Sequence, residues 1–184
     1  DLQPLDSSLG DLASVYLSFL DYGFNEQTGR FRNFMSYDRR WLEETGSEDS
    51  HGRALWGLGK AVALGRDKGQ VNVALDLFLR ARDTVEDFTH SRAIAFAIIG
   101  MHAYLSRFSS DSRVNRMQKI LSDRLMAGFR NSATEDWPWC EDILSYDNAR
   151  LPQALLLSGQ WLADREMLEM GLRALEWLHN VQTH

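Results

Sequence analysis

The chain is poor in residues that stiffen or cross-link a fold, with three prolines and one cysteine among 184 residues. Because Cys140 has no second cysteine as a partner, no internal disulfide can form, which favours a reducing compartment. The longest apolar run, residues 93–101, is too short to cross a bilayer, which needs about 20 residues. No signal peptide is recognisable. We therefore expect a cytoplasmic protein that does not insert into membranes.

Clustered positive charge is also lacking. The formal net charge is −6, and lysines and arginines form no stripe. Nucleic acid is not an expected partner, because binding its phosphates requires clustered cations. The histidines and the cysteine lack metal-binding spacings, so neither a metal nor another cofactor is expected. The absence of a Gly-x-Gly-x-x-Gly motif and of strand–helix–strand patterning argues against a Rossmann domain.

The chain does contain two kinds of helical pattern, which alternate. Four segments carry one apolar stripe each: 9–24, 70–85, 112–131 and 164–181. The first stripe comprises Leu9, Leu12, Ala13, Tyr16 and Leu20, and the last comprises Met167, Leu168, Gly171, Leu175 and Leu178. The segments between them, 49–65, 91–107 and 148–159, are apolar nearly all round. A striped helix has one buried face, whereas a helix that is apolar all round must be buried. The alternation predicts an all-α domain with buried inner helices and solvent-facing outer helices.

Two connections are much longer than the others. Residues 25–46 interleave aromatic residues with arginines, and residues 30–36 could form a brief β-ribbon. Residues 132–147 contain tryptophans, a tyrosine and several acidic residues. Connections of this length are usually functional or disordered, and the aromatic content argues against disorder. Since both lead directly into inner helices, we expect both to lie at the same end of the domain.

A weak repeat marks the inner helices. Each begins with a polar residue, a small residue and an arginine, as in His51-Gly52-Arg53, His90-Ser91-Arg92 and Asn148-Ala149-Arg150. If the inner helices are parallel, their N-termini gather at one end, where they provide free N–H groups and partial positive charge. The repeat therefore predicts a polar cup at this end.

The residues in and around these triplets resemble a known family. Residues 47–56 (SEDSHGRALW) and 137–155 (WPWCEDILSYDNARLPQAL) are similar to motifs of a bacterial helical-toroid family. Members of this family often carry glycosyltransferase names, or lie fused to or beside glycosyltransferases. Residues 31–34 and 37–41 resemble the same family, and the resemblance covers nearly the whole chain. It implies an (α/α) toroid of the six-hairpin kind, which many glycosidases and sugar epimerases share.

The chain differs from the family pattern in two respects. Family members have further hairpins before and after this region, so the resemblance implies that residues 1–184 form a single helical domain within a larger (α/α)6 toroid. Cys140 occupies a position where the pattern has an aromatic residue. Inner helices left uncovered at the two edges would expose apolar surface, from which we expect self-association. The resemblance also suggests a glycosyltransferase partner and an oligosaccharide or sugar substrate.

Acidic residues near the expected cup are the candidate catalytic groups. Glycoside hydrolysis requires one protonated and one ionised carboxyl group. We expect Glu141 or Asp142 to be the acid and Asp49 or Asp147 to be the second carboxylate. The alternative roles are structural. Glu141 or Asp142 could cap the next helix or pair with Arg150, while Asp49 or Ser50, and likewise Asp147, could be helix N-caps.

The candidate substrate-binding residues surround these acids. They are His51, Arg53, Trp137, Trp139, Tyr146, Asp147, Asn148 and Arg150. Trp137 and Trp139 are candidates for stacking on sugar rings, whereas a tryptophan on a helix, such as Trp56, is more often core. Arg53, Arg92 and Arg150 could clamp an anionic group, but we favour the interpretation that they hold Asp49 and Glu141 in position. A thiol nucleophile at Cys140 is not favoured, since no histidine is suitably placed in the sequence.

Three functions are consistent with these features. The first is a carbohydrate-active enzyme, glycosidase-like or linked to glycosyl transfer, that acts on a glycan in the cup. The second is a non-catalytic module that binds a glycan or docks on a glycosyltransferase. The third is a helical scaffold that binds only protein.

Overall fold

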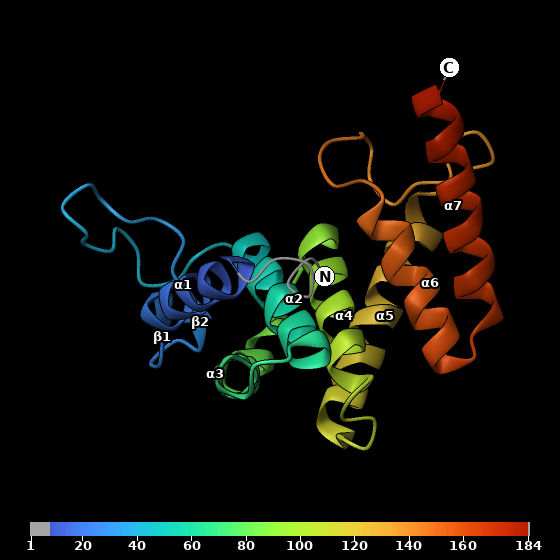
Figure 1. Ribbon diagram of the computed structural model, residues 1–184. Coiled ribbons are helices and arrows are strands. Elements are labelled where there is room, and N and C mark those ends of the chain that lie inside the picture. Colours follow the sequence, from blue (N-terminus) through green and yellow to red (C-terminus); the bar gives the residue numbers. More distant parts are fainter. Residues whose placement is uncertain (1–7, 184) are drawn as a thin grey trace.

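The computed structural model describes residues 8–183, which are mostly helical (Figure 1). The helices are α1 (Ser8–Gly23), α2 (Glu48–Leu64), α3 (Lys68–Ala81), the 3-10 helix η1 (Arg82–Asp87), α4 (Ser91–Leu105), α5 (Ser112–Ser132), α6 (Arg150–Leu162) and α7 (Arg165–Thr183). Two short strands, β1 (Phe24–Asn25) and β2 (Arg30–Phe31), pair antiparallel. The predicted all-α class is confirmed. The β-ribbon expected in residues 30–36 is limited to β2 and an isolated bridge between Met35 and Trp41.

Side-chain caps fix where several helices begin. Ser47 Oγ accepts a hydrogen bond of 3.1 Å from the Ser50 N–H at the start of α2, which satisfies a donor that the helix leaves unpaired. The expectation that Asp49 or Ser50 caps α2 is therefore wrong. Asp147 does not cap α6 either, because the residue before the helix is Ala149 and no side chain caps it.

Helices α2 and α4 lie side by side and run parallel (Figure 1). Gly52 faces Ala93 near the start of both helices, and Gly59 faces Gly100 about two turns further along. A Cβ atom on Gly59 would lie 2.1 Å from the carbonyl oxygen of Gly100. Only glycine permits this approach of two backbones, so these glycines set the distance between the two helices.

Helix α6 continues the same parallel arrangement on the other side of α4. Arg92 donates to Asn148 where these two helices begin, and the rings of His102 and Trp161 meet near their ends. The N-termini of α2, α4 and α6 therefore lie at the same end of the molecule.

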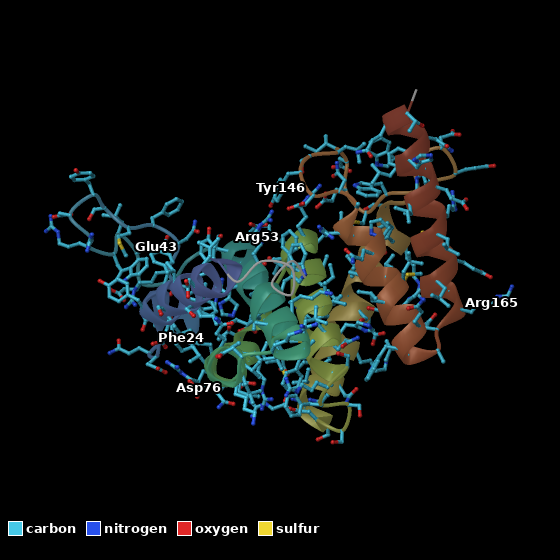
Figure 2. The ribbon with its side chains drawn as sticks, in the orientation of Figure 1. Phe24, Glu43, Arg53, Asp76, Tyr146 and Arg165 are labelled. Carbon is cyan, nitrogen blue, oxygen red and sulfur yellow. The ribbon has the colours of Figure 1, made fainter. Side chains whose placement is uncertain are left out.

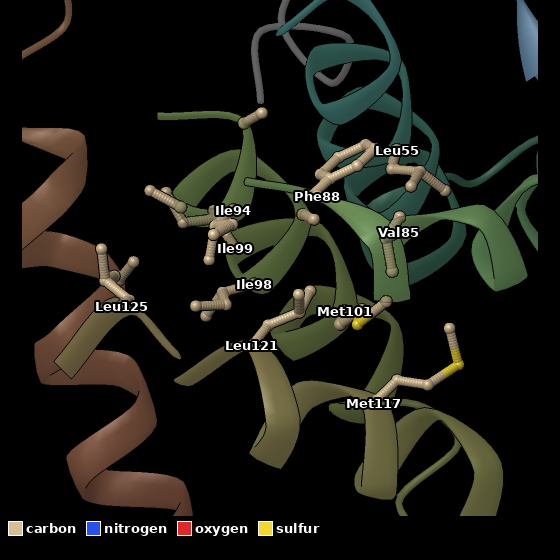
Figure 3. Close-up of a cluster of buried hydrophobic side chains, with 14 of the residues drawn as sticks. Leu55, Val85, Phe88, Ile94, Ile98, Ile99, Met101, Met117, Leu121 and Leu125 are labelled. Carbon is tan, nitrogen blue, oxygen red and sulfur yellow. The ribbon is translucent and has the colours of Figure 1, made fainter. Parts of the chain in front are cut away.

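Helix α4 forms the centre of the core (Figure 3). Its isoleucines Ile94 and Ile98 pack in one buried cluster with Leu121 and Leu125 of α5. The buried residues of α5 recur at intervals of three and four, as the striped pattern predicts: Val114, Met117, Gln118, Leu121, Ser122, Leu125, Met126 and Phe129. The prediction of complete burial is correct for α4, because neighbouring helices contact it on several sides.

The same prediction is wrong for one face of α2. Trp56 is only half-buried, and Gly57 and Lys60 are exposed. The physical reason is position, since α2 has α4 on one side and no equivalent parallel helix on the other among residues 8–183. An apolar composition shows that a helix can be buried on all sides, but its neighbouring helices determine which of its side chains are buried.

Two of the predicted outer stripes are also inaccurate. In α1, Leu12 and Tyr16 are exposed while Leu17 is buried, and the side chain of Leu9 lies outside the described part of the chain. In α7, Leu175 is exposed, whereas the buried face comprises Met167, Gly171, Ala174 and Leu178. Within residues 8–183, no helix has the combination of length and apolar content that a membrane span requires.

Candidate functional site

The segment between α5 and α6 folds back over the starts of α2 and α4, and Tyr146 is its point of contact. Figure 2 shows Tyr146 beside Arg53, with Glu43 distant in another loop. The Tyr146 hydroxyl donates to Asp49 Oδ1 at 2.8 Å, and its carbonyl accepts from Arg92 Nε at 2.6 Å. The guanidinium carbons of Arg53 and Arg92 lie 5.6 and 4.9 Å from the centre of its ring. One residue of the loop thus joins two helices.

Arg53 holds two carboxylates in place. Its Nε donates to Asp49 Oδ2 at 2.9 Å, and its Nη2 lies 2.6 Å from Asp147 Oδ2. Partial burial lowers the pKa of Arg53, but the hydrogen bonds and charges of the two aspartates outweigh this effect and raise it. Asp147 adopts a left-handed conformation with φ of 48°, which is unusual for a residue other than glycine. The ion pair with Arg53 holds the side chain of this residue in place.

Arg92 anchors the rest of the same loop. Its side chain is only 8% exposed. It forms an ion pair with Glu141 through Nη1 and donates from Nη2 to Asn148 Oδ1 at 2.8 Å. A buried guanidinium needs such partners, because charge is costly to remove from water. The structure therefore shows Arg53 and Arg92 in the positioning role that the sequence favoured.

Arg150 differs from the other two arginines. Its Nη1 donates to the Gln153 side chain at 2.7 Å, and no carboxylate among the described residues pairs with it. The alternative that Glu141 pairs with Arg150 is therefore wrong. The Arg150 guanidinium instead lies 4.4 Å from the ring centre of Trp56, a favourable cation–π geometry.

Trp56 connects this arginine to the rest of the site. Its ring is parallel to that of Phe96, with centres 5.7 Å apart, and Arg53 covers the Phe96 ring at 4.3 Å. A continuous column of Arg150, Trp56, Phe96 and Arg53 thus links α6, α2 and α4. Sequence reasoning missed this column because Trp56 and Phe96 match ordinary core positions on apolar helices.

His51 is not a substrate-binding residue, contrary to expectation. It is fully buried, and both ring nitrogens have partners. Nδ1 accepts from the Phe31 N–H at 3.2 Å, so the proton resides on Nε2, which lies 3.0 Å from the Ala81 carbonyl oxygen and 3.0 Å from Thr84 Oγ1. Burial, together with the positive charge of Arg30, lowers the pKa of His51 to about 3. The residue joins β2 and the end of α3 to α2.

The two candidate stacking tryptophans also pack against other residues of the protein, which gives them a structural role. Trp139 is fully buried between Phe129 and Trp177, so it offers no face to a ligand. Trp137 is half-buried, packs edge-on against Trp177 and donates from Nε1 to the Glu141 carbonyl. Both rings attach the loop to α5 and α7, which was not evident from a Trp-Pro-Trp sequence on a long connection.

The remaining candidates lie at the margin of the site. Asp142 is exposed and makes no hydrogen bond or ion pair with another described residue. Asn148 accepts from Arg92 and from the Ser145 N–H, so its amide stabilises the loop. Cys140 is buried, and burial with the nearby charge of Glu141 raises the pKa of its thiol to about 12. Such a thiol is a poor nucleophile.

The arrangement has the chemistry of a polar binding surface. Asp49 and Asp147 each keep 33% of their side-chain surface exposed, and their oxygens retain capacity to accept further hydrogen bonds. In residues 8–183, no group of His, Cys, Asp and Glu side chains is arranged to hold a metal ion. Comparison with known proteins found no matching family model, no similar curated protein and no similar solved structure.

Proposed function

We propose that this chain is part of an (α/α) toroid whose cup, at the common N-terminal end of α2, α4 and α6, binds a glycan. The observation that carries the proposal is the bridge from Arg53 to Asp49 and Asp147 beside the Tyr146 hydroxyl. Partly exposed carboxylates, a guanidinium and a phenol provide the acceptors and donors that sugar hydroxyl groups require. The sequence resemblance to a carbohydrate-related family supports the same conclusion.

Binding without catalysis is the form of this function that the geometry favours. A glycosidase needs a proton-bearing acid near a second carboxylate. The expected acid, Glu141, is instead engaged in an ion pair with the buried Arg92 guanidinium, where it anchors the loop. Asp142 is exposed and has no partner that would position it. We therefore propose a glycan-binding module, cytoplasmic and associated with a glycosyltransferase.

An enzymatic function remains the second candidate because of one observation. Arg53 brings two carboxylates together at an accessible surface, and one of them could act as the charged carboxylate of a glycosidase-like reaction. If the chain is an enzyme in which Glu141 is the acid, Glu141→Gln should abolish turnover while the protein remains folded. If the variant retains full turnover, Glu141 is not the acid.

The binding proposal can be tested by NMR titration of the isotope-labelled chain with a panel of manno- and gluco-oligosaccharides. We expect chemical-shift changes around Asp49 and Tyr146, and at least tenfold weaker binding after Asp49→Asn. Asp142→Asn is the matched control, because that exposed side chain has no partner, and it should bind normally. No shift with any sugar at millimolar concentration would contradict the proposal. Release of reducing sugar on long incubation would instead support the enzyme.

A further inference from the structure

A second surface, which borders the polar site at Arg53 and Trp56, is an open groove between α1 and α2. The groove has a volume of about 740 Å³. Its walls include Leu20 of α1 with Lys60, Leu64 and Arg66 at the other side. Most of this lining is apolar and includes the exposed ring of Tyr16. Leu12 and Val15 are exposed further round α1, whereas the rings of Phe19 and Tyr22 pack against Trp41. An apolar area this continuous on a folded chain indicates an interaction surface.

The charge of the groove restricts what can occupy it. Its lining contains Arg53, Lys60 and Arg66 but no aspartate or glutamate, although the whole chain has a net charge of −6. Arg53 is paired with carboxylates of the polar site. Lys60 and Arg66 form no ion pair with any residue in the described range. The groove is therefore complementary to a helix that is apolar on one side and acidic beside it.

Helix α7 of this chain has such a surface. Leu172 and Leu175 are exposed and form a leucine stripe on one side of the helix, whereas Leu168 is half-buried and packs against Gly159 of α6. Leu172 is 50% exposed. Glu169 and Glu176 lie next to this leucine stripe, and Glu176 has no ion-pair partner among the described residues. Glu169 is paired with the exposed Arg165, so Glu176 is the acidic group that the stripe offers to a partner.

The groove and the leucine stripe lie at opposite ends of the molecule. Figure 1 shows α1 at one side and α7 at the other, with α2, α4 and α6 between them. One copy cannot bring its two ends together without unfolding. A contact between different surfaces of two copies is heterologous, or head-to-tail.

We propose that the α1–α2 groove of one copy receives the leucine stripe of α7 from a second copy. Leu172 and Leu175 fill the apolar part of the groove, and Glu176 lies close to Lys60 and Arg66. The predicted assembly is a head-to-tail oligomer of the chain. Arg53 and Trp56 line both surfaces, but the variants that test this proposal change none of the residues tested for glycan binding, so the two proposals can fail separately.

The mass of the full chain in solution provides the first test. Sedimentation velocity at tens of micromolar should show species of at least twice the mass of one chain. The groove variant carries both Tyr16→Glu and Lys60→Glu, and the stripe variant carries Leu172→Lys. Each of the two variants should weaken association at least tenfold. Lys119→Glu on α5 and Val181→Lys, on the opposite side of α7 from Leu172, are the matched controls and should assemble normally. Circular dichroism verifies that all variants are folded.

Mixing the two defective variants provides the decisive test. The groove variant still has an intact leucine stripe, and the stripe variant still has an intact groove. An equimolar mixture should therefore form a dimer with one chain of each kind, which neither variant forms alone. A monomeric wild-type chain, a mixture that remains monomeric, or loss of association from only one of the two surfaces would overturn the proposal.

Discussion

The hydroxyl of Tyr146 lies 2.8 Å from a carboxylate oxygen of Asp49, although 97 positions separate the two residues in the sequence. Burial and the charge of Asp49 raise the pKa of Tyr146, so the phenol stays protonated and donates. Tyr146→Phe removes only this donor. We expect it to lower the free energy of unfolding by about 0.5–1 kcal/mol, because the hydroxyl is partly exposed to water. Tyr37→Phe, at a fully exposed ring, should change nothing in the same urea titration.

Arg92 should be the most sensitive residue of the loop contact. Arg92→Met leaves Glu141, the Tyr146 carbonyl and Asn148 without their donor, and we expect a loss of about 3 kcal/mol. Limited proteolysis should then cut between α5 and α6. Lys119→Met breaks an exposed pair with Asp123 and should cost less than about 0.5 kcal/mol. Equal losses in the two variants would show that Arg92 does not anchor the loop.

The contact between α2 and α4 can be tested with two glycines of the same helix. Gly59→Ala places a methyl group against the Gly100 backbone, so we expect a loss of about 3 kcal/mol. Gly57→Ala meets no atom within 4 Å. It should stabilise the protein by about 0.5–1 kcal/mol, because alanine favours helix. Thermal unfolding distinguishes the two variants, and a stable Gly59→Ala would argue against this close packing.

His51 should make the folded state sensitive to acid. Its folded pKa of about 3 lies far below the ordinary value of 6.5, so the unfolded chain binds the proton first as the pH falls. The stability contribution of His51 is complete above about pH 6.5 and decreases by up to about 1.4 kcal/mol per pH unit as the pH falls towards 3. Urea unfolding between about pH 5 and 8 measures this slope.

His51→Gln is the control for this prediction, because glutamine has a donor and an acceptor but does not titrate. Its unfolding free energy should depend less on pH over the same interval. If the variant does not fold, the NMR signals of the His51 ring in the native wild type serve instead, and they should not titrate above pH 5. A ring that titrates with the ordinary value of a histidine would disprove the assignment.

Much of the fold could be predicted from periodicity alone. Apolar spacing identified each helix to within a few residues, because burial of one face is encoded locally. The polar-small-arginine triplets also predicted that the helix starts meet. In α2, however, the triplet lies inside the helix, since Ser47 rather than a residue of the triplet provides the cap. The seven-residue spacing of Gly52 and Gly59 was a further signal for the contact with α4.

The site was less predictable, because its partners are chosen by tertiary packing. The sequence predicted that arginines hold carboxylates, but it could not distinguish Arg92 from Arg150 as the partner of Glu141. Nor could it distinguish an exposed tryptophan from Trp139, whose burial depends on Trp177 in a later helix. Local pattern indicates which chemistry is present, and the packing of distant segments decides which groups remain accessible.

The contact of the loop with α2 fixes when the polar site can form during synthesis of the chain. During synthesis, Asp49 and Arg53 leave the ribosome long before Tyr146 and Asp147 are made. Until then, Asp49 and Arg53 lack their contacts with the loop between α5 and α6. The polar site is consequently among the last features to form, and a cellular ligand can bind it only after α6 has packed beside α4.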